Sequence, residues 1–230
     1  MKRIFPFILL TLISSLSSSC ARLPQIVSES GSNSVVPIVP LGGIFPSGRW
    51  QLTHAIDAIV MGGEKSGLLG VSVLSSSDRT LRCALMTLEG FVLFAGRFDG
   101  RLTVERALPP FDRPGFAKGL IDDLILLFFP PEGAIQQTGK LPDGARVSRF
   151  GSSWDGTIDV IIRDDHTWSV HKYASRHRIE RSIEASDIGG IGSGSGSGKG
   201  SCFAGRLTLK RHGLSGYQLN LRLVDAVALP

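Results

Sequence analysis

The chain has 230 residues, three cysteines and a formal charge of +5 at pH 7. This length suits one domain that buries a hydrophobic core without disulfide staples. The small excess of positive charge gives little reason to expect an anionic macromolecule as a partner.

The first 20 residues have the pattern of a secretory signal peptide. Lys2 and Arg3 precede a largely apolar run over residues 4–13, and a serine-rich segment then leads to Cys20. A charged start, a short apolar centre and a small-residue exit define such a peptide. The apolar run is too short to span a bilayer, which takes about 20 residues.

Small residues before the first cysteine resemble a bacterial lipobox, in which the thiol is acylated and the peptide is cut just before it. We therefore predict a lipoprotein signal peptide over residues 1–19 and a lipid on Cys20. An ordinary signal peptide is the alternative, because Ser17 stands where a lipobox usually has Leu. An Asp after the cysteine would suggest retention at the inner membrane, so Ala21 favours the outer membrane. Export from the cytoplasm also argues against a nucleic-acid partner.

Residues 20–46 are rich in Ser, Pro and Gly, and we predict a flexible tether there. The folded domain is expected over residues 47–230. Its first strand begins after Gly48, because Trp50, Leu52 and His54 alternate with polar residues.

Several short strands and one helix follow. Asp99-Gly100 between alternating apolar segments predicts a hairpin with a type I′ turn. Apolar residues at helical spacing, closed by Pro130-Pro131, predict an amphipathic helix over residues 116–128. Residues 176–188 give no clear pattern, and the Gly/Ser-rich stretch 189–201 is predicted to be a loop. The remaining strands are expected at 68–74, 81–86, 91–98, 102–104, 146–150, 157–163, 167–173, 203–210 and 217–227.

This arrangement predicts an α+β fold, an antiparallel β-barrel or curled sheet with one main covering helix. No second apolar stretch is long enough to span a membrane. Cys83 and Cys202 could pair in an oxidising compartment, but each also lies in an apolar, strand-like run where a free thiol packs as a small hydrophobe.

Three searches for chemistry return weak candidates. Gly198-Lys199 lacks the spacing and the Ser or Thr of a phosphate-binding loop. His166, His171 and His177 read as solvated positions rather than zinc ligands. No Gly-x-Ser-x-Gly elbow occurs in a strand-to-helix setting, so a serine nucleophile has no recognisable context. We therefore expect no enzyme, no metal and no cofactor.

Five ordered segments carry a resemblance to a known family. They are Trp50-Gln51-Leu52, residues 84–91, residues 98–102, residues 119–124 and residues 216–221. Together they resemble the LolA/LolB-like superfamily, and within it an uncharacterised family of bacterial outer-membrane lipoproteins. The resemblance implies an unclosed antiparallel β-barrel whose concave side is plugged by helices, with a hydrophobic cavity between that holds acyl chains.

The resemblance predicts a non-enzymatic lipoprotein on the periplasmic face of the outer membrane, which binds an acyl chain or a lipidated partner. Two alternatives stay open. One is a scaffold that docks onto an envelope complex through a sheet edge, and the other is a lipid hydrolase using Ser152 or Ser153 with His166. The oligomeric state is not predicted. The residues expected to line the cavity are Trp50, Leu85, Phe91, Phe94, Leu124 and Phe128.

Overall fold

The structure, a computed structural model, describes residues 23–27, 41, 43–60, 65–152, 156–174, 177–188, 203–213 and 216–230. These residues form one helix and twelve strands. In chain order they are β1 (Arg49–Val60), β2 (Lys65–Ser75), β3 (Thr80–Thr87), β4 (Val92–Phe98), β5 (Leu102–Ala107), α1 (Pro114–Phe128), β6 (Ala134–Lys140), β7 (Arg146–Ser152), β8 (Gly156–Ile162), β9 (Trp168–Tyr173), β10 (Ile179–Ile188), β11 (Ala204–Arg211) and β12 (Tyr217–Leu229).

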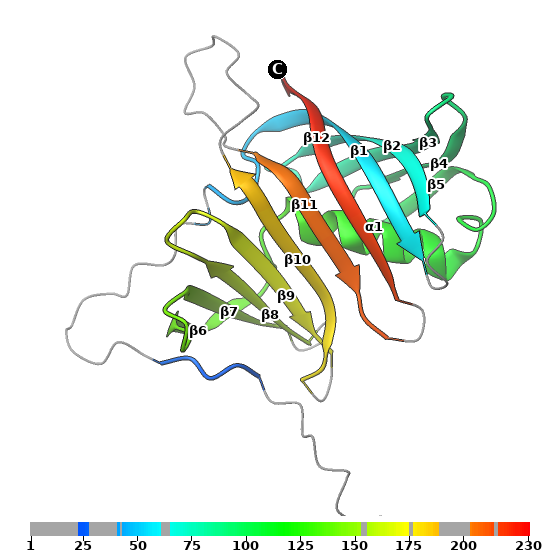
Figure 1. The fold of residues 1–230 in the computed structure, drawn as a ribbon. Coiled ribbons are helices and arrows are strands. Elements are labelled where there is room, and N and C mark those ends of the chain that lie inside the picture. Colours follow the sequence, from blue (N-terminus) through cyan, green and yellow to red (C-terminus); the bar gives the residue numbers. More distant parts are fainter. Residues whose placement is uncertain are drawn as a thin grey trace, which may run out of the picture.

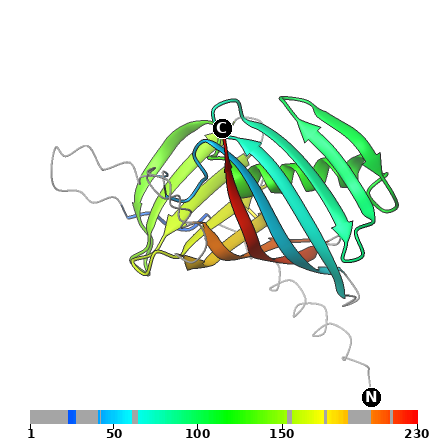
Figure 2. The ribbon, with the colours of Figure 1, turned by 90° about the horizontal axis from the view of Figure 1, so that it is seen from above.

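All twelve strands belong to one antiparallel sheet in the order β5-β4-β3-β2-β1-β12-β11-β10-β9-β8-β7-β6. The two halves of the chain meet where β1 pairs with β12 at the centre of the sheet. Figures 1 and 2 show the sheet curling around α1, which lies on its concave side. Strands β5 and β6 are the two ends of the strand order and do not pair with each other, so the barrel is unclosed. The predicted α+β class is confirmed.

The main core lies between the inner face of the sheet and α1. Alternate residues of each strand point inward, and Leu52, Phe94, Val160 and Leu209 are buried almost completely. Each such side chain contributes about 1.5–3 kcal/mol of transfer free energy when buried. The alternation over Trp50, Leu52 and His54 is therefore the inner face of β1, as predicted.

Helix α1 covers this core with one apolar face. Pro114 occupies the first turn, where its missing N–H costs nothing. Ala117, Ile121 and Phe128 are buried against the sheet. The helix ends because Phe129 is extended and Pro130 follows it. The predicted helix is confirmed, although it begins two residues earlier.

The β4–β5 hairpin is present, but its turn differs from the expected type. Phe98 pairs with Leu102, so three residues form the loop. Gly100 has φ of 88°, whereas Asp99 is not in the left-handed region. A type I′ turn needs positive φ at both central residues, so that part of the prediction was wrong.

Residues 23–27, which we name the N-terminal strap, lie against the outer face of the sheet beside the β6 edge. Val27 exchanges two backbone hydrogen bonds with Lys140, with N···O distances of 2.8 and 3.0 Å. Ile26 is buried in a second small core with Val147 and Ile161. The segment predicted to be a flexible tether thus contains a docked portion.

Gly139 of β6 allows this close approach. A Cβ atom at this position would lie 2.4 Å from the backbone oxygen of Val27 and 2.7 Å from Cγ2 of Ile26. Both distances are shorter than real Cβ contacts, so any side chain here would push the strap away.

Some predictions fall on residues that the structure does not describe. They concern the signal peptide and Cys20, the Gly/Ser-rich loop 189–201 with Gly198-Lys199, and Cys202. Among the described residues, Cys83 has a free thiol. The same residues contain no helix that is both long and apolar enough to cross a membrane.

Candidate functional site

An apolar pocket lies between α1 and the inner face of the sheet. Four of the six residues predicted to line a cavity meet there, namely Leu85 of β3, Phe94 of β4, and Leu124 and Phe128 of α1. The cavity has a volume of about 30 Å³, which is enough for only a few water molecules. The interior of the barrel is therefore almost filled at this point. The other lining residues are His54, Ile56, Gly70, Ser72, Cys83, Ala84, Leu120 and Leu221.

The two remaining predicted residues lie elsewhere. Trp50 packs edge-on against Phe203 with ring centroids 4.8 Å apart, and its indole N–H donates to the Ser47 carbonyl. Phe91 is 70% exposed in the β3–β4 turn, where Leu88 is equally exposed. Against our expectation, Phe91 points to solvent, because the turn carries it beyond the paired part of β3 and β4.

The pocket carries no charge at neutral pH on the residues that the structure describes. Burial lowers the pKa of His54 to about 4, so its imidazole is neutral, and its ring lies 5.9 Å from that of Phe128. Burial also raises the pKa of the Cys83 thiol to about 12. The lining therefore suits an uncharged apolar group.

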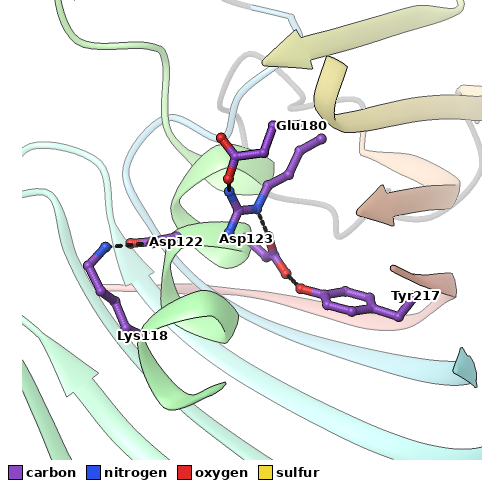
Figure 3. Close-up of polar contacts among 6 residues, drawn as sticks. Lys118, Asp122, Asp123, Glu180 and Tyr217 are labelled. Carbon is purple, nitrogen blue, oxygen red and sulfur yellow. Dashed lines mark hydrogen bonds and ion pairs between the residues drawn. The ribbon is translucent and has the colours of Figure 1, made fainter. Parts of the chain in front are cut away.

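A buried polar cluster fastens α1 to the sheet beside this pocket (Figure 3). Asp123 of α1 accepts hydrogen bonds from the Arg181 guanidinium of β10 and from the Tyr217 hydroxyl of β12. Arg181 also donates to Glu180. Asp123 and Arg181 are almost fully buried, with side-chain exposures of 1% and 4%. The cluster therefore joins three elements that are distant in sequence.

Burial raises the pKa of Asp123, and the positive charge of Arg181 and the hydrogen bond from Tyr217 offset part of that increase. The pKa of Tyr217 is raised, mainly by burial and also by the nearby Asp123 carboxyl. By contrast, Asp122 points to the surface, where it pairs with Lys118 at 2.7 Å.

Sequence reasoning missed the members of this cluster. Asp123 lies within the predicted helix, but no partner or role is predicted for it. Arg181 lies within residues 176–188, for which the sequence predicts no element, and Tyr217 begins a predicted strand with no predicted partner. The available signal was an Asp on the apolar side of an amphipathic helix, since a charge there requires a partner.

The other candidate chemistry does not come together in the described residues. His166 and His177 lie at exposed turns with positive φ, and His171 is half-buried on β9. No group of three or more His, Cys, Asp and Glu residues in these ranges could hold a metal ion. Ser153 and the side chain of Ser152 lie outside the described part of the chain, so the hydrolase alternative stays untested.

Comparison with solved structures shows the fold that this chain shares. A LolA superfamily protein from Nitrosomonas europaea superposes with a TM-score of 0.56 at 11% identity, over 82% of this chain and 89% of the other. A Vibrio parahaemolyticus domain described as an outer membrane lipoprotein-sorting protein gives a TM-score of 0.42 at 10% identity, over 78% and 85% of the two chains.

No protein-family model and no curated protein matches the sequence. The resemblance noted in the sequence is thus supported at the level of a LolA-like fold.

Proposed function

We propose that this protein is a non-enzymatic, lipid-anchored carrier or assembly factor that binds an acyl chain or a lipidated partner. It would be exported by the signal peptide over residues 1–19, acylated on Cys20, and held at the periplasmic face of the outer membrane. A LolA-like fold supports the lipid-binding role. The observation that carries the proposal is the apolar, uncharged pocket beneath α1.

A cavity of about 30 Å³ is too small for an acyl chain of ordinary length. Binding therefore requires α1 to move away from the inner face, which would open the core between the helix and β1–β4. The Asp123 cluster lies at the helix and would limit how far α1 can separate from the sheet. The carrier proposal thus predicts a ligand-dependent movement of α1.

The first experiment measures displacement of a fluorescent fatty acid from the purified protein. Native mass spectrometry of the same protein detects any lipid that is already bound. Leu124→Trp fills the pocket and should abolish binding. Ile125→Trp is a matched control, since Ile125 is the next residue of the same helix, is half-buried and does not line the pocket. No bound lipid under either method, or equal loss in both variants, would refute the carrier.

The second experiment tests the anchor. Palmitate labelling of cells that express the chain should give a labelled protein, and Cys20→Ser should abolish the label. Labelling that survives in the Cys20→Ser variant would contradict the predicted acylation site. This experiment is independent of the pocket.

One observation favours a second candidate function. A scaffold that docks through a sheet edge needs no internal cavity, and the interior here is nearly filled. Strand β5 ends the sheet, and Thr103, Val104, Glu105 and Arg106 of that strand are exposed. Lipid-free protein that still copurifies with a partner through β5 would support the scaffold over the carrier.

A further inference from the structure

A larger hollow of about 380 Å³ lies at the other surface of the sheet. It is formed where β1 and β3 begin and where β2 and β4 end. Arg82 and Arg97 line it, and they alternate along their strands with Leu81 and Phe98, which pack in the core. The hollow therefore opens on the outer face, opposite the side covered by α1.

Three guanidinium groups from three strands line this hollow, and the only acid among the lining residues is Asp99. Arg97 lies 3.9 Å from that carboxylate, which is a loose ion pair. Arg49 donates one hydrogen bond to the Pro230 carbonyl. The Arg82 guanidinium forms no hydrogen bond or ion pair with the residues that the structure describes. The lining thus carries a net charge of about +2.

The placement of two of these arginines is unfavourable without a ligand. Arg82 and Arg97 are direct register partners on β3 and β4, so their side chains leave the same face side by side. Like charges directly opposite each other destabilise a sheet. An anion between them would convert this repulsion into attraction, and a concave site strengthens the local field.

We propose that this hollow is a binding site for a phosphate group. A guanidinium offers two parallel N–H donors that match two oxygens of one phosphate. A carboxylate has only two oxygens and satisfies one such group, whereas a phosphate has enough acceptors for Arg82 and Arg97 together. The hydroxyl of Thr80, which also lines the hollow, adds a further donor. The phosphate could belong to a lipid headgroup or be free in solution.

The test uses the full chain in detergent and isothermal titration calorimetry with two probes, inorganic phosphate and glycerophosphoglycerol. The second probe is a phospholipid headgroup without acyl chains, so it cannot bind through the apolar pocket. We expect a Kd on the order of 1 mM for at least one probe. Arg82→Gln/Arg97→Gln should weaken binding by at least about tenfold.

A matched control exists in the same sheet. Arg206 and Arg222 are register partners on β11 and β12, point to the outer face, and do not line the hollow. Arg206→Gln/Arg222→Gln removes the same charge and should leave the Kd within about twofold. Binding of glycerophosphoglycerol alone would identify a lipid headgroup, and binding of inorganic phosphate alone a free anion; both support the site.

Two results would overturn the proposal. One is the absence of heat with either probe at about 10 mM, ten times the expected Kd. The other is equal weakening in both double variants, which would show a general effect of charge. A thermal melt checks folding, and Arg82→Gln alone replaces the double variant if that protein is unstable. Because neither probe has an acyl chain, the outcome does not depend on the proposed carrier function.

Discussion

Two buried carboxylate–guanidinium pairs lie on opposite faces of the sheet, and each attaches a different kind of segment to it. On the concave side, Asp123 and Arg181 are 58 residues apart and join α1 to β10. On the outer side, Asp159 and Arg149 are register partners on β8 and β7, with two N–H···O bonds of 2.7 Å. Arg149 also donates to the Pro24 carbonyl of the N-terminal strap.

The comparison shows how one type of interaction can serve two kinds of attachment. Each carboxylate receives two donors, so its burial is compensated by hydrogen bonds. The inner pair fixes a helix over the main core, whereas the outer pair fixes a short extended segment over a small core. The two faces should therefore respond differently when either pair is broken.

The largest effect is expected from Asp123→Ala and Asp159→Ala. Asp159→Ala leaves the Arg149 guanidinium buried without a counter-charge, and Asp123→Ala leaves Arg181 with only the partly exposed Glu180. Loss of a buried partner costs about 3–5 kcal/mol of unfolding free energy. Urea unfolding monitored by circular dichroism measures both losses. Losses below about 1 kcal/mol would show that water enters the site and solvates the remaining arginine.

Hydrogen exchange then separates the two variants. Asp123→Ala should increase the amide exchange rates of α1 and change fatty-acid binding. Asp159→Ala should increase the exchange rates of the strap and leave fatty-acid binding unchanged. Identical exchange patterns in the two variants would remove the distinction between the two faces.

A buried histidine sharpens the comparison. His54 is 3% exposed, and burial lowers its folded pKa to about 4 from 6.5. Between these values the unfolded chain binds more protons, so stability falls as pH decreases from 6.5 towards 4. The loss should reach about 3 kcal/mol at the lower end.

His54→Leu supplies the measurement for this group. Unfolding free energy should decline less steeply in the variant over the same pH window, while other titrating groups affect both proteins equally. Parallel curves for the two proteins would mean that His54 accepts a proton without unfolding.

A smaller effect is expected from Gly139→Ala, which tests the strap alone. The added Cβ would meet the Val27 backbone, so the strap should detach. The unfolding free energy should fall by about 2 kcal/mol, mainly because Ile26 is no longer buried. Gly115→Ala is the control, because a Cβ there meets open space. Protease cleavage near residues 23–27 should increase only in the first variant.

The smallest effect is expected from Tyr217→Phe. This change removes one of the two donors to Asp123 and keeps the ion pair with Arg181. A loss of about 1.5 kcal/mol in thermal or urea unfolding follows from one hydrogen bond to a carboxylate. A loss as large as that of Asp123→Ala would make Tyr217, rather than Arg181, the main partner.

The local pattern of apolar residues was sufficient to predict the strands and the helix that bury an apolar face. Alternation predicted β1 and most other strands, and spacing with flanking prolines predicted α1. Strand β6 was missed because its residues are mostly exposed or half-buried and include Gln136 and Gln137. Strand β10 was missed because buried Arg181 and Ser182 interrupt its apolar alternation.

The candidate site was only partly predictable for a related reason. Large apolar residues in regular elements, such as Phe94 and Leu124, point to the core by periodicity alone. Phe91 lies in a turn, where no period fixes the side-chain direction. The partners of Asp123 come from strands about 60 and 90 residues away, and sheet order is needed to bring them together.

The docked strap also limits the distance between the folded domain and the lipid that we propose on Cys20. Only Ala21 and Arg22 separate Cys20 from residue 23, so the backbone between them can span at most about 10 Å. An acyl group on Cys20 would hold the β6 edge close against the bilayer surface, whereas an undocked chain to residue 46 would reach several times farther. The strap would thereby orient the barrel on the membrane. Release of the strap would allow the domain to rotate freely relative to the bilayer.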